Sequence, residues 1–135
     1  MPSFDDSTIA RAPVEEVWKL LYDPMCFPRW WEGVETTVPT PQGGDGDFTI
    51  YPDGYPDFPM PQELRPAADG RGLTISCLVS YLVFEWRLEP LDGDAGSRIA
   101  VHVEIPEPEA HRLDAQRGAV SASLRSLAAL ATATA

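Results

Sequence analysis

The last long segment of the chain, Glu109 to Ala131, most restricts what the chain can fold into. On an α-helix, with about 100° between residues, its apolar side chains fall on one stripe. This stripe consists of Leu113, Val120, Leu124, Leu127 and Ala131. The prolines and glutamates at positions 106–109 suit the start of a helix. A helix of about six turns must cover a large apolar surface. Because the apolar segments before it have the pattern of strands, we predict that the helix packs on one curved sheet.

The charge balance limits the kinds of partner. The 135 residues include 21 Asp and Glu against 10 Lys and Arg, which gives a formal net charge of −11. Phosphate-rich partners would be repelled, so we expect neither nucleic acid nor an anionic membrane to bind. The length suits one domain, residues 1–135, that can hold a core and a cavity. The expected partner is therefore a small molecule that is neutral, apolar or cationic.

Cysteine usage and hydropathy favour the cytoplasm. Cys26 and Cys77 are the only cysteines and have no CxxC spacing, so neither a disulfide framework nor a metal site is indicated. The chain does not open with a basic, apolar leader, and its apolar runs are shorter than the roughly 18 residues that a membrane span needs. We predict a cytoplasmic protein, monomer or homodimer, without membrane insertion, cofactor or metal.

The first third of the chain predicts one strand and two short helices. Phe4 to Ala10 alternates weakly, as an edge strand does, and a helix begins at Pro13. Cys26 to Trp31 adds a short helical turn rich in aromatic residues. Neighbours on a helix point about 100° apart, so we expect one of Trp30 and Trp31 to pack inside and the other to lie at a cavity mouth. The alternative is a hydrophobic plug made by both.

From Val34 onward the apolar period changes to two, and glycine-rich turns separate the segments. Six strands are predicted, at residues 34–38, 47–51, 60–66, 73–79, 81–89 and 97–105. The last two alternate most regularly, since Phe84, Trp86 and Leu88 leave the charged residues between them on the other face. With the first strand, seven antiparallel strands are expected.

This order of elements resembles the helix-grip domain of the START-like (SRPBCC) superfamily, in its polyketide cyclase/dehydrase and lipid-transport branch. Four segments carry the resemblance, namely residues 9–18, 28–34, 84–90 and 97–105 before the closing helix. It implies an α+β fold in which a seven-stranded antiparallel sheet wraps around the long C-terminal helix, with two short helices after the first strand. A fold does not fix an activity, because one fold hosts many functions.

The resemblance also implies a cavity between the long helix and the sheet. Apolar and aromatic side chains are expected to line it for a hydrophobic or aromatic ligand. The predicted ligand-binding residues are Trp18, Trp30, Trp31, Phe48, Phe58, Tyr81, Phe84, Trp86, Val101, Val103, Leu113, Val120 and Leu124. The alternative is a core that these large side chains fill completely.

Four polar residues are the candidates for catalysis. Tyr51, Tyr55 and Asp57 belong to a proline-rich segment that suits either a loop gating the cavity or a stiff sheet edge. Arg117 falls beside the apolar stripe of the long helix, so its guanidinium either extends to solvent or meets an acceptor in the cavity. These groups would supply donors and acceptors for a carbonyl-rich ligand.

Other catalytic patterns are weak. His102 falls on the wet face of its strand and His111 in the first turn of the closing helix, so they form no metal pair. Cys77 has the parity of a small core residue. We therefore predict binding of a polyketide-like ligand, with non-redox cyclisation or dehydration as the activity if the protein is an enzyme. A non-enzymatic carrier is the alternative, and a chaperone-activator-like interaction domain is a third.

Overall fold

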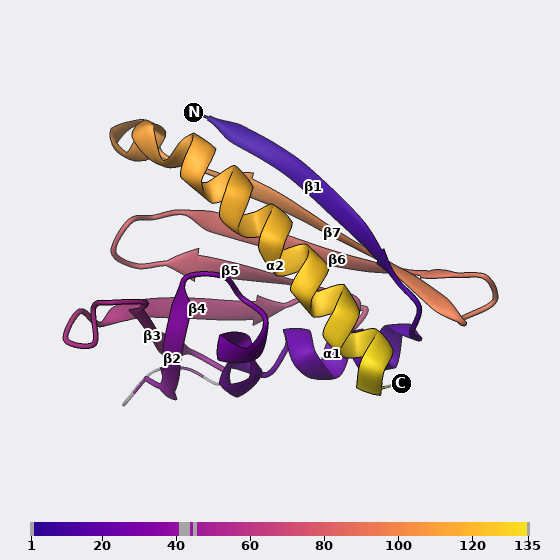
Figure 1. Cartoon of the computed structure of the whole chain (residues 1–135). Helices are drawn as coiled ribbons and strands as arrows, with labels where there is room; N and C mark the ends of the chain where they lie inside the picture. Colours follow the sequence, from indigo (N-terminus) through magenta and orange to yellow (C-terminus); the bar gives the residue numbers. More distant parts are fainter. Residues whose placement is uncertain (1, 41–43, 45, 135) are drawn as a thin grey trace.

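The computed structural model describes residues 2–40, 44 and 46–134. A first strand is followed by two short helices, six more strands and a long C-terminal helix (Figure 1). The elements are β1 (Ser3–Ala10), α1 (Val14–Leu21), the 3₁₀ helix η1 (Pro24–Arg29), β2 (Val34–Pro39), β3 (Phe48–Pro52), β4 (Met60–Pro66), β5 (Gly72–Cys77), β6 (Val83–Leu91), β7 (Gly96–Glu104), the 3₁₀ helix η2 (Glu107–Arg112) and α2 (Leu113–Thr134).

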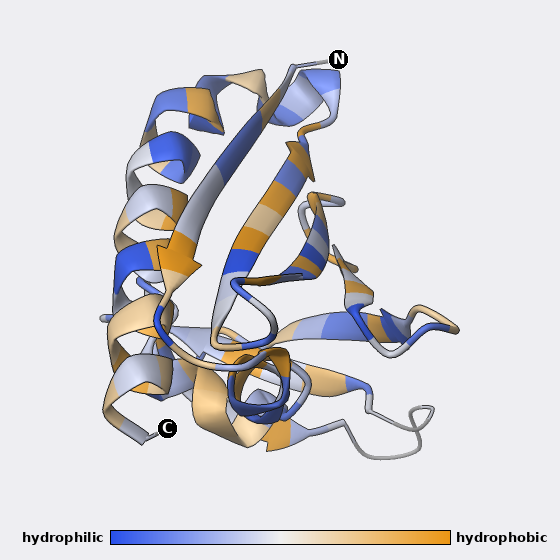
Figure 2. Cartoon of the chain, turned by 90° about the vertical axis from the view of Figure 1, so that its right-hand side faces the viewer, coloured by the Kyte–Doolittle hydropathy of each residue, from blue (hydrophilic) through white to orange (hydrophobic). Residues whose placement is uncertain are grey.

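The strands form one antiparallel sheet in the order β1-β7-β6-β5-β4-β3-β2. Each strand pairs with its neighbour in sequence, except that β1 closes onto β7 at one edge. Inward and outward side chains alternate, which Figure 2 shows as hydrophobic and hydrophilic bands along the strands. The seven-stranded antiparallel sheet predicted from the alternation is confirmed.

The long helix lies across one face of this sheet (Figure 1). Its buried side chains include Val120, Leu124 and Leu127, all from the predicted stripe. The helix begins later than predicted, because the turn between Glu107 and Arg112 is 3₁₀ and regular α-helix starts at Leu113. Along its length α2 packs on β1 and α1, so the other flank of the helix faces the middle strands of the sheet.

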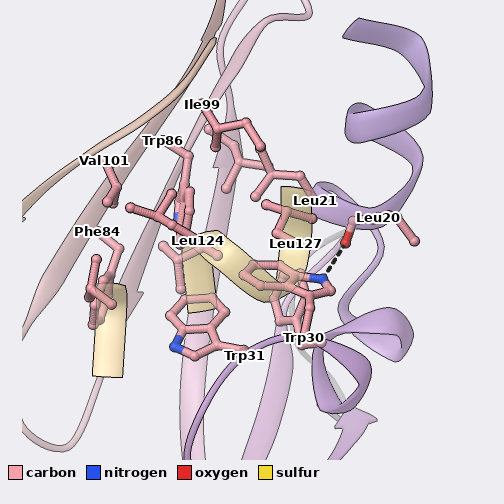
Figure 3. Packing of buried hydrophobic residues seen from close by; sticks show 14 of the residues in the cluster. Leu20, Leu21, Trp30, Trp31, Phe84, Trp86, Ile99, Val101, Leu124 and Leu127 are labelled. Atoms are coloured by element: carbon pink, nitrogen blue, oxygen red, sulfur yellow. Dashed lines mark hydrogen bonds between the residues drawn. The ribbon is translucent and has the colours of Figure 1, made fainter. Parts of the chain in front are cut away.

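An aromatic cluster fills the deep part of the space between α1, η1 and the sheet (Figure 3). Trp30 and Trp31 are both buried and their rings stack with centroids 5.4 Å apart, as expected for the alternative of a plug made by both indoles. The helical angle of about 100° does not apply because η1 ends at Arg29, and Trp30 has a φ of −139° and a ψ of −23°, outside the helical region. Phe27 and Trp86 contact both indoles edge-on or at a tilt.

The connection between β5 and β6 also differs from the prediction. Residues 78–82 form a turn, whereas the alternation had extended both strands through Val79 and Tyr81. Tyr81 has a φ of +62°, and its amide donates to the Cys77 carbonyl at 3.0 Å. A left-handed conformation is uncommon for a tyrosine, so a turn without glycine or asparagine left no signal in the sequence.

Candidate functional site

A cavity of about 290 Å³ lies between the first half of α2 and the middle strands of the sheet. Its apolar walls come from the strands and from the segment after η1. They include Trp31, Val34, Ile50, Met60, Leu82 and Phe84. The helix α2 contributes only small or polar side chains to the lining, namely Ala115, Gln116 and Ala119. The cavity exists because alanines face the sheet where a larger residue would fill the space.

Two polar side chains border the cavity from the helix side. Arg112 ends η2, and its Nε donates to Glu109 Oε2 at 2.9 Å. The two residues are three positions apart, about one helical turn, and both side chains are partly exposed. The ion pair therefore holds the guanidinium in place without fully burying it. Gln116 follows one turn later, and its amide forms no hydrogen bond with a described residue. The two groups offer N–H donors to a ligand oxygen.

The sheet side of the cavity carries a second polar group. Gln62 and Cys77 are register partners on β4 and β5, and Ser80 follows in the next turn. All three are buried. The Ser80 amide donates to Cys77 Sγ at 3.4 Å. Burial raises the pKa of the Cys77 thiol, but hydrogen bonds from Ser80, Val79 and Gln62 outweigh it and leave the pKa below its ordinary value.

Trp31 brings an unpaired donor to the same cavity. Its side chain is 8% exposed, and its indole N–H forms no hydrogen bond with a described residue. Figure 3 shows the indole nitrogen on the side of the ring that faces Phe84, away from Trp30. A Ser123 hydroxyl accepts from the Glu32 amide at 2.8 Å and so ties this segment to α2. The Trp31 N–H is not fully buried, so an acceptor on a ligand in the cavity can reach it.

Of the predicted ligand-binding residues, Trp31 and Phe84 line this cavity. Most others form the packed core beside it. That core includes Trp30, Phe48, Trp86, Val101, Val103, Val120 and Leu124, with Trp18 and Leu113 partly buried against it. Phe58 and Tyr81 lie in exposed turns. The sheet and helix therefore enclose both a filled aromatic core and a smaller cavity.

The four candidates for catalysis lie away from this cavity. Tyr51 borders a shallow hollow with Glu35, Thr36 and Pro56, and Tyr55 and Asp57 are exposed in the β3–β4 turn. Arg117 is exposed, with its guanidinium carbon 5.7 Å from the centre of the Phe4 ring on β1. It extends toward β1, and Arg112 is the arginine at the cavity.

A larger hollow of about 670 Å³ lies on the outer face of β1, β6 and β7. Its rim is charged, and His102 there contacts Asp5 at 2.9 Å and Glu104 at 3.4 Å. Hydrogen bonding to Asp5 raises the pKa of His102, with Glu104 adding to the effect. The described residues contain no group of three or more His, Cys, Asp or Glu placed to hold a metal. The lining of this hollow is mostly charged, whereas the inner cavity is lined mainly by apolar side chains.

Sequence comparison connects this geometry to a known family. The family model described as polyketide cyclase/dehydrase and lipid transport matches residues 1–133. The chain belongs to this family. No curated protein sequence shows significant similarity to it.

Several solved structures share the helix-grip fold of this protein. The di-domain aromatase/cyclase BexL of the BE-7585A biosynthetic pathway superimposes with a TM-score of 0.79 at 16% identity. The match covers 95% of this chain and 45% of BexL, so the chain spans less than half of that protein. The ZhuI aromatase/cyclase from Streptomyces sp. R1128 gives 0.75 at 16% identity, over 96% of this chain and 93% of its own.

A START superfamily protein from Mycobacterium smegmatis gives a TM-score of 0.70 at 12% identity, covering 98% of this chain and 95% of its own. At identities this low the superpositions establish the shared fold alone, and the START-like helix-grip architecture is confirmed by them. Within the described part of this family member, the helices are too short or too polar to cross a membrane.

The cavity residues that the prediction missed had a partial signal. Arg112, Gln116 and Ala119 recur at helical spacing and form a small and polar stripe roughly 80° from the apolar one. Gln62 shares the inward parity of Leu64, which makes it a polar residue on an apolar face. Neither pattern says which flank of the helix faces open space, since the crossing of helix and sheet decides that.

Proposed function

We propose that this protein binds a small aromatic or polyketide-like molecule of one or two rings in the cavity between α2 and the sheet. The observation that carries the proposal is the combination of apolar walls with accessible N–H donors on one side. Apolar contact comes from the aromatic rings of Trp31 and Phe84 and from the aliphatic side chain of Leu82. The N–H groups come from Arg112 and Gln116. An apolar pocket with a few convergent polar groups suits binding of this kind of ligand.

The size of the cavity restricts the ligand. About 290 Å³ stands at the lower end of the roughly 300–1,000 Å³ of ligand pockets. The aromatic cluster of Phe27, Trp30 and Trp86 occupies the space that a larger ligand would need. A compact compound with a ketone or enolate oxygen therefore fits better than a folded chain of many rings.

Arg112 is the proposed contact for that oxygen. Its guanidinium is held by Glu109 and retains further N–H donors, because arginine carries five. A hydrogen bond from a charged donor contributes about 1.5–3 kcal/mol. The Glu109 carboxylate lowers the net charge at the mouth, so a neutral carbonyl is favoured over a highly charged anion.

The test uses 2-acetylnaphthalene and its oxygen-free counterpart 2-ethylnaphthalene, with binding followed by quenching of Trp fluorescence. Arg112→Met should weaken binding of the ketone about 10- to 100-fold and leave binding of the hydrocarbon nearly unchanged. Arg117→Met is the matched control, since Arg117 extends toward Phe4 on the other flank of α2. Equal losses for both variants, or failure of both compounds to bind wild-type protein, would rule out the proposed site.

A non-redox cyclase or dehydratase is the second candidate, and the family description together with the donors at the cavity favours it. In such a reaction an enolate carbon attacks a carbonyl carbon, and the resulting alcohol loses water. Arg112 and Trp31 would hold the carbonyl oxygens during bond formation. A linear aromatic 1,3,5-triketone is the substrate to test, because cyclisation changes its absorbance. A carrier would release the triketone unchanged.

A further inference from the structure

The binding proposal leaves the polar group on the sheet side of the cavity unused. Gln62 and Cys77 face each other on β4 and β5, with 4% and 5% of their surfaces exposed. Their inward neighbours on these strands are the apolar Leu64 and Ile75. Ser80, also buried, closes the group from the turn. All three border the cavity, so a ligand there would contact them.

Cys77 has the surroundings of a reactive thiol rather than a packing residue. The Ser80 amide donates to its sulfur at 3.4 Å, and hydrogen bonding from Ser80, Val79 and Gln62 holds the pKa of the thiol below its ordinary value. Donors of this kind stabilise the thiolate, which is the nucleophilic form. Cys26 differs, because burial and the nearby Asp23 carboxylate raise the pKa of its thiol.

Trp31 supplies the independent sign of a ligand. Its side chain is more than nine-tenths buried and lines the same cavity with an indole N–H that has no partner among the described residues. The Trp31 and Phe84 rings lie 5.2 Å apart. Phe84 pairs with Ile75, which places Cys77 diagonally across from it on the same face at roughly 7–8 Å between Cα atoms. An acceptor and an electrophilic carbon within one small ligand can therefore meet both groups.

We propose that Cys77 is a nucleophile that captures α,β-unsaturated carbonyl compounds in this cavity. The inference rests on the ligand binding proposed above and adds a reactive class of ligand to it. The thiolate sulfur forms a bond to the β-carbon, and the electron pair of the carbon–carbon double bond moves to give an enolate. The Trp31 N–H holds the enolate oxygen, and the α-carbon then takes up a proton in place of the one that the thiol released. The product is the simple sum of protein and ligand, so the step needs no oxidant and expels no leaving group.

The experiment treats native protein with benzylideneacetone, a small aromatic enone, and measures intact mass and labelled peptides over time. We expect one adduct, on Cys77, although Cys26 is the more exposed thiol. Cys77→Ser should lose the adduct, and Cys26→Ser should keep it at the wild-type rate. Peptide mapping of the wild-type protein gives the same answer without any variant, so the test does not depend on the folding of Cys77→Ser.

The saturated ketone 4-phenylbutan-2-one separates the two proposals. It cannot react with a thiol, but it should quench Trp fluorescence and slow the labelling of Cys77 by competition. If the saturated ketone binds but the enone does not label Cys77, or labels Cys26 first, then Cys77 is not the proposed nucleophile. The proposed binding site would still stand. Absence of binding by the saturated ketone would overturn both.

Discussion

Trp30 and Trp86 offer a direct test of how the aromatic cluster is held together. Both indoles are almost completely buried, and their rings meet edge-on with centroids 5.5 Å apart. They differ in their N–H groups. Trp30 Nε1 donates to the Leu20 carbonyl at 3.0 Å, as Figure 3 shows, whereas Trp86 Nε1 is buried and has no partner among the described residues.

The Leu20 carbonyl depends on this hydrogen bond. In a continuing helix it would accept from the amide four residues later, which is Pro24 and has no N–H. Trp30→Phe removes the donor and leaves a buried acceptor unpaired, at a cost of about 1–3 kcal/mol. Trp86→Phe removes a donor that is already unpaired, which recovers a similar amount. Both substitutions delete the same atoms, so the loss of apolar burial is comparable.

We therefore expect Trp30→Phe to be less stable than Trp86→Phe by at least about 2 kcal/mol, or about 8 °C in Tm for a chain of this size. Urea unfolding followed by far-ultraviolet circular dichroism measures the difference without relying on the fluorescence of the indole that was removed. The two rings are in contact, so the single variants are compared with wild type and no additivity is assumed. Equal destabilisation would refute the reasoning and would mean that the Trp86 N–H is satisfied, for example by the π face of a neighbouring indole.

Two further predictions concern titrating groups on the surface of the sheet. The hydrogen bond that His102 donates to the Asp5 carboxylate raises the pKa of His102 in the folded state. The stabilising contribution of His102 is therefore complete below its unfolded pKa and is lost as the pH rises through the folded value. His102→Gln should flatten the decline in Tm that wild type shows with rising pH between about pH 5 and pH 8, and an unchanged slope would contradict the assignment. Asp47 accepts from the amides of Leu64 and Gly44 and from Arg65, which together outweigh burial and lower its pKa. Asp47→Asn should lower the free energy of unfolding by about 1–3 kcal/mol at neutral pH, with the difference from wild type shrinking as the pH falls through the folded pKa of Asp47, and a difference independent of pH would count against this role.

The elements of the fold could be predicted because local periodicity and burial agree. Phe84, Trp86 and Leu88 alternate with charged residues, and the structure buries these three and exposes their neighbours. The strand order follows from hairpins between successive strands, which need only short turns. The prediction failed where a turn had no glycine, at residues 78–82, and where a 3₁₀ helix ended just before Trp30.

The site could be predicted only in outline, because it depends on how α2 crosses the sheet. Arg117 and Arg112 both lie near the start of the helix, about 140° apart around its axis. Packing of α2 on β1 turns the flank with Arg117 toward Phe4, and the flank with Arg112 then faces the middle strands. Angles around one helix do not show which flank meets an empty space, since that space is defined by residues of β3 to β6.

The inside of the fold is thus divided between two kinds of surface. Toward α1 and η1, large aromatic side chains fill the space and contact one another edge-on, and Trp30 also caps α1 through its bond to the Leu20 carbonyl. Toward η2, the helix contributes alanines to the cavity wall, and the opposite wall contains Gln62, Cys77 and Ser80 instead of aliphatic residues. Buried polar groups in a wall that could have been apolar reduce stability unless they have partners. The unpaired Trp31 donor lies at the border of the two regions, which is where a bound carbonyl would complete its hydrogen bonding while its ring packs on Phe84.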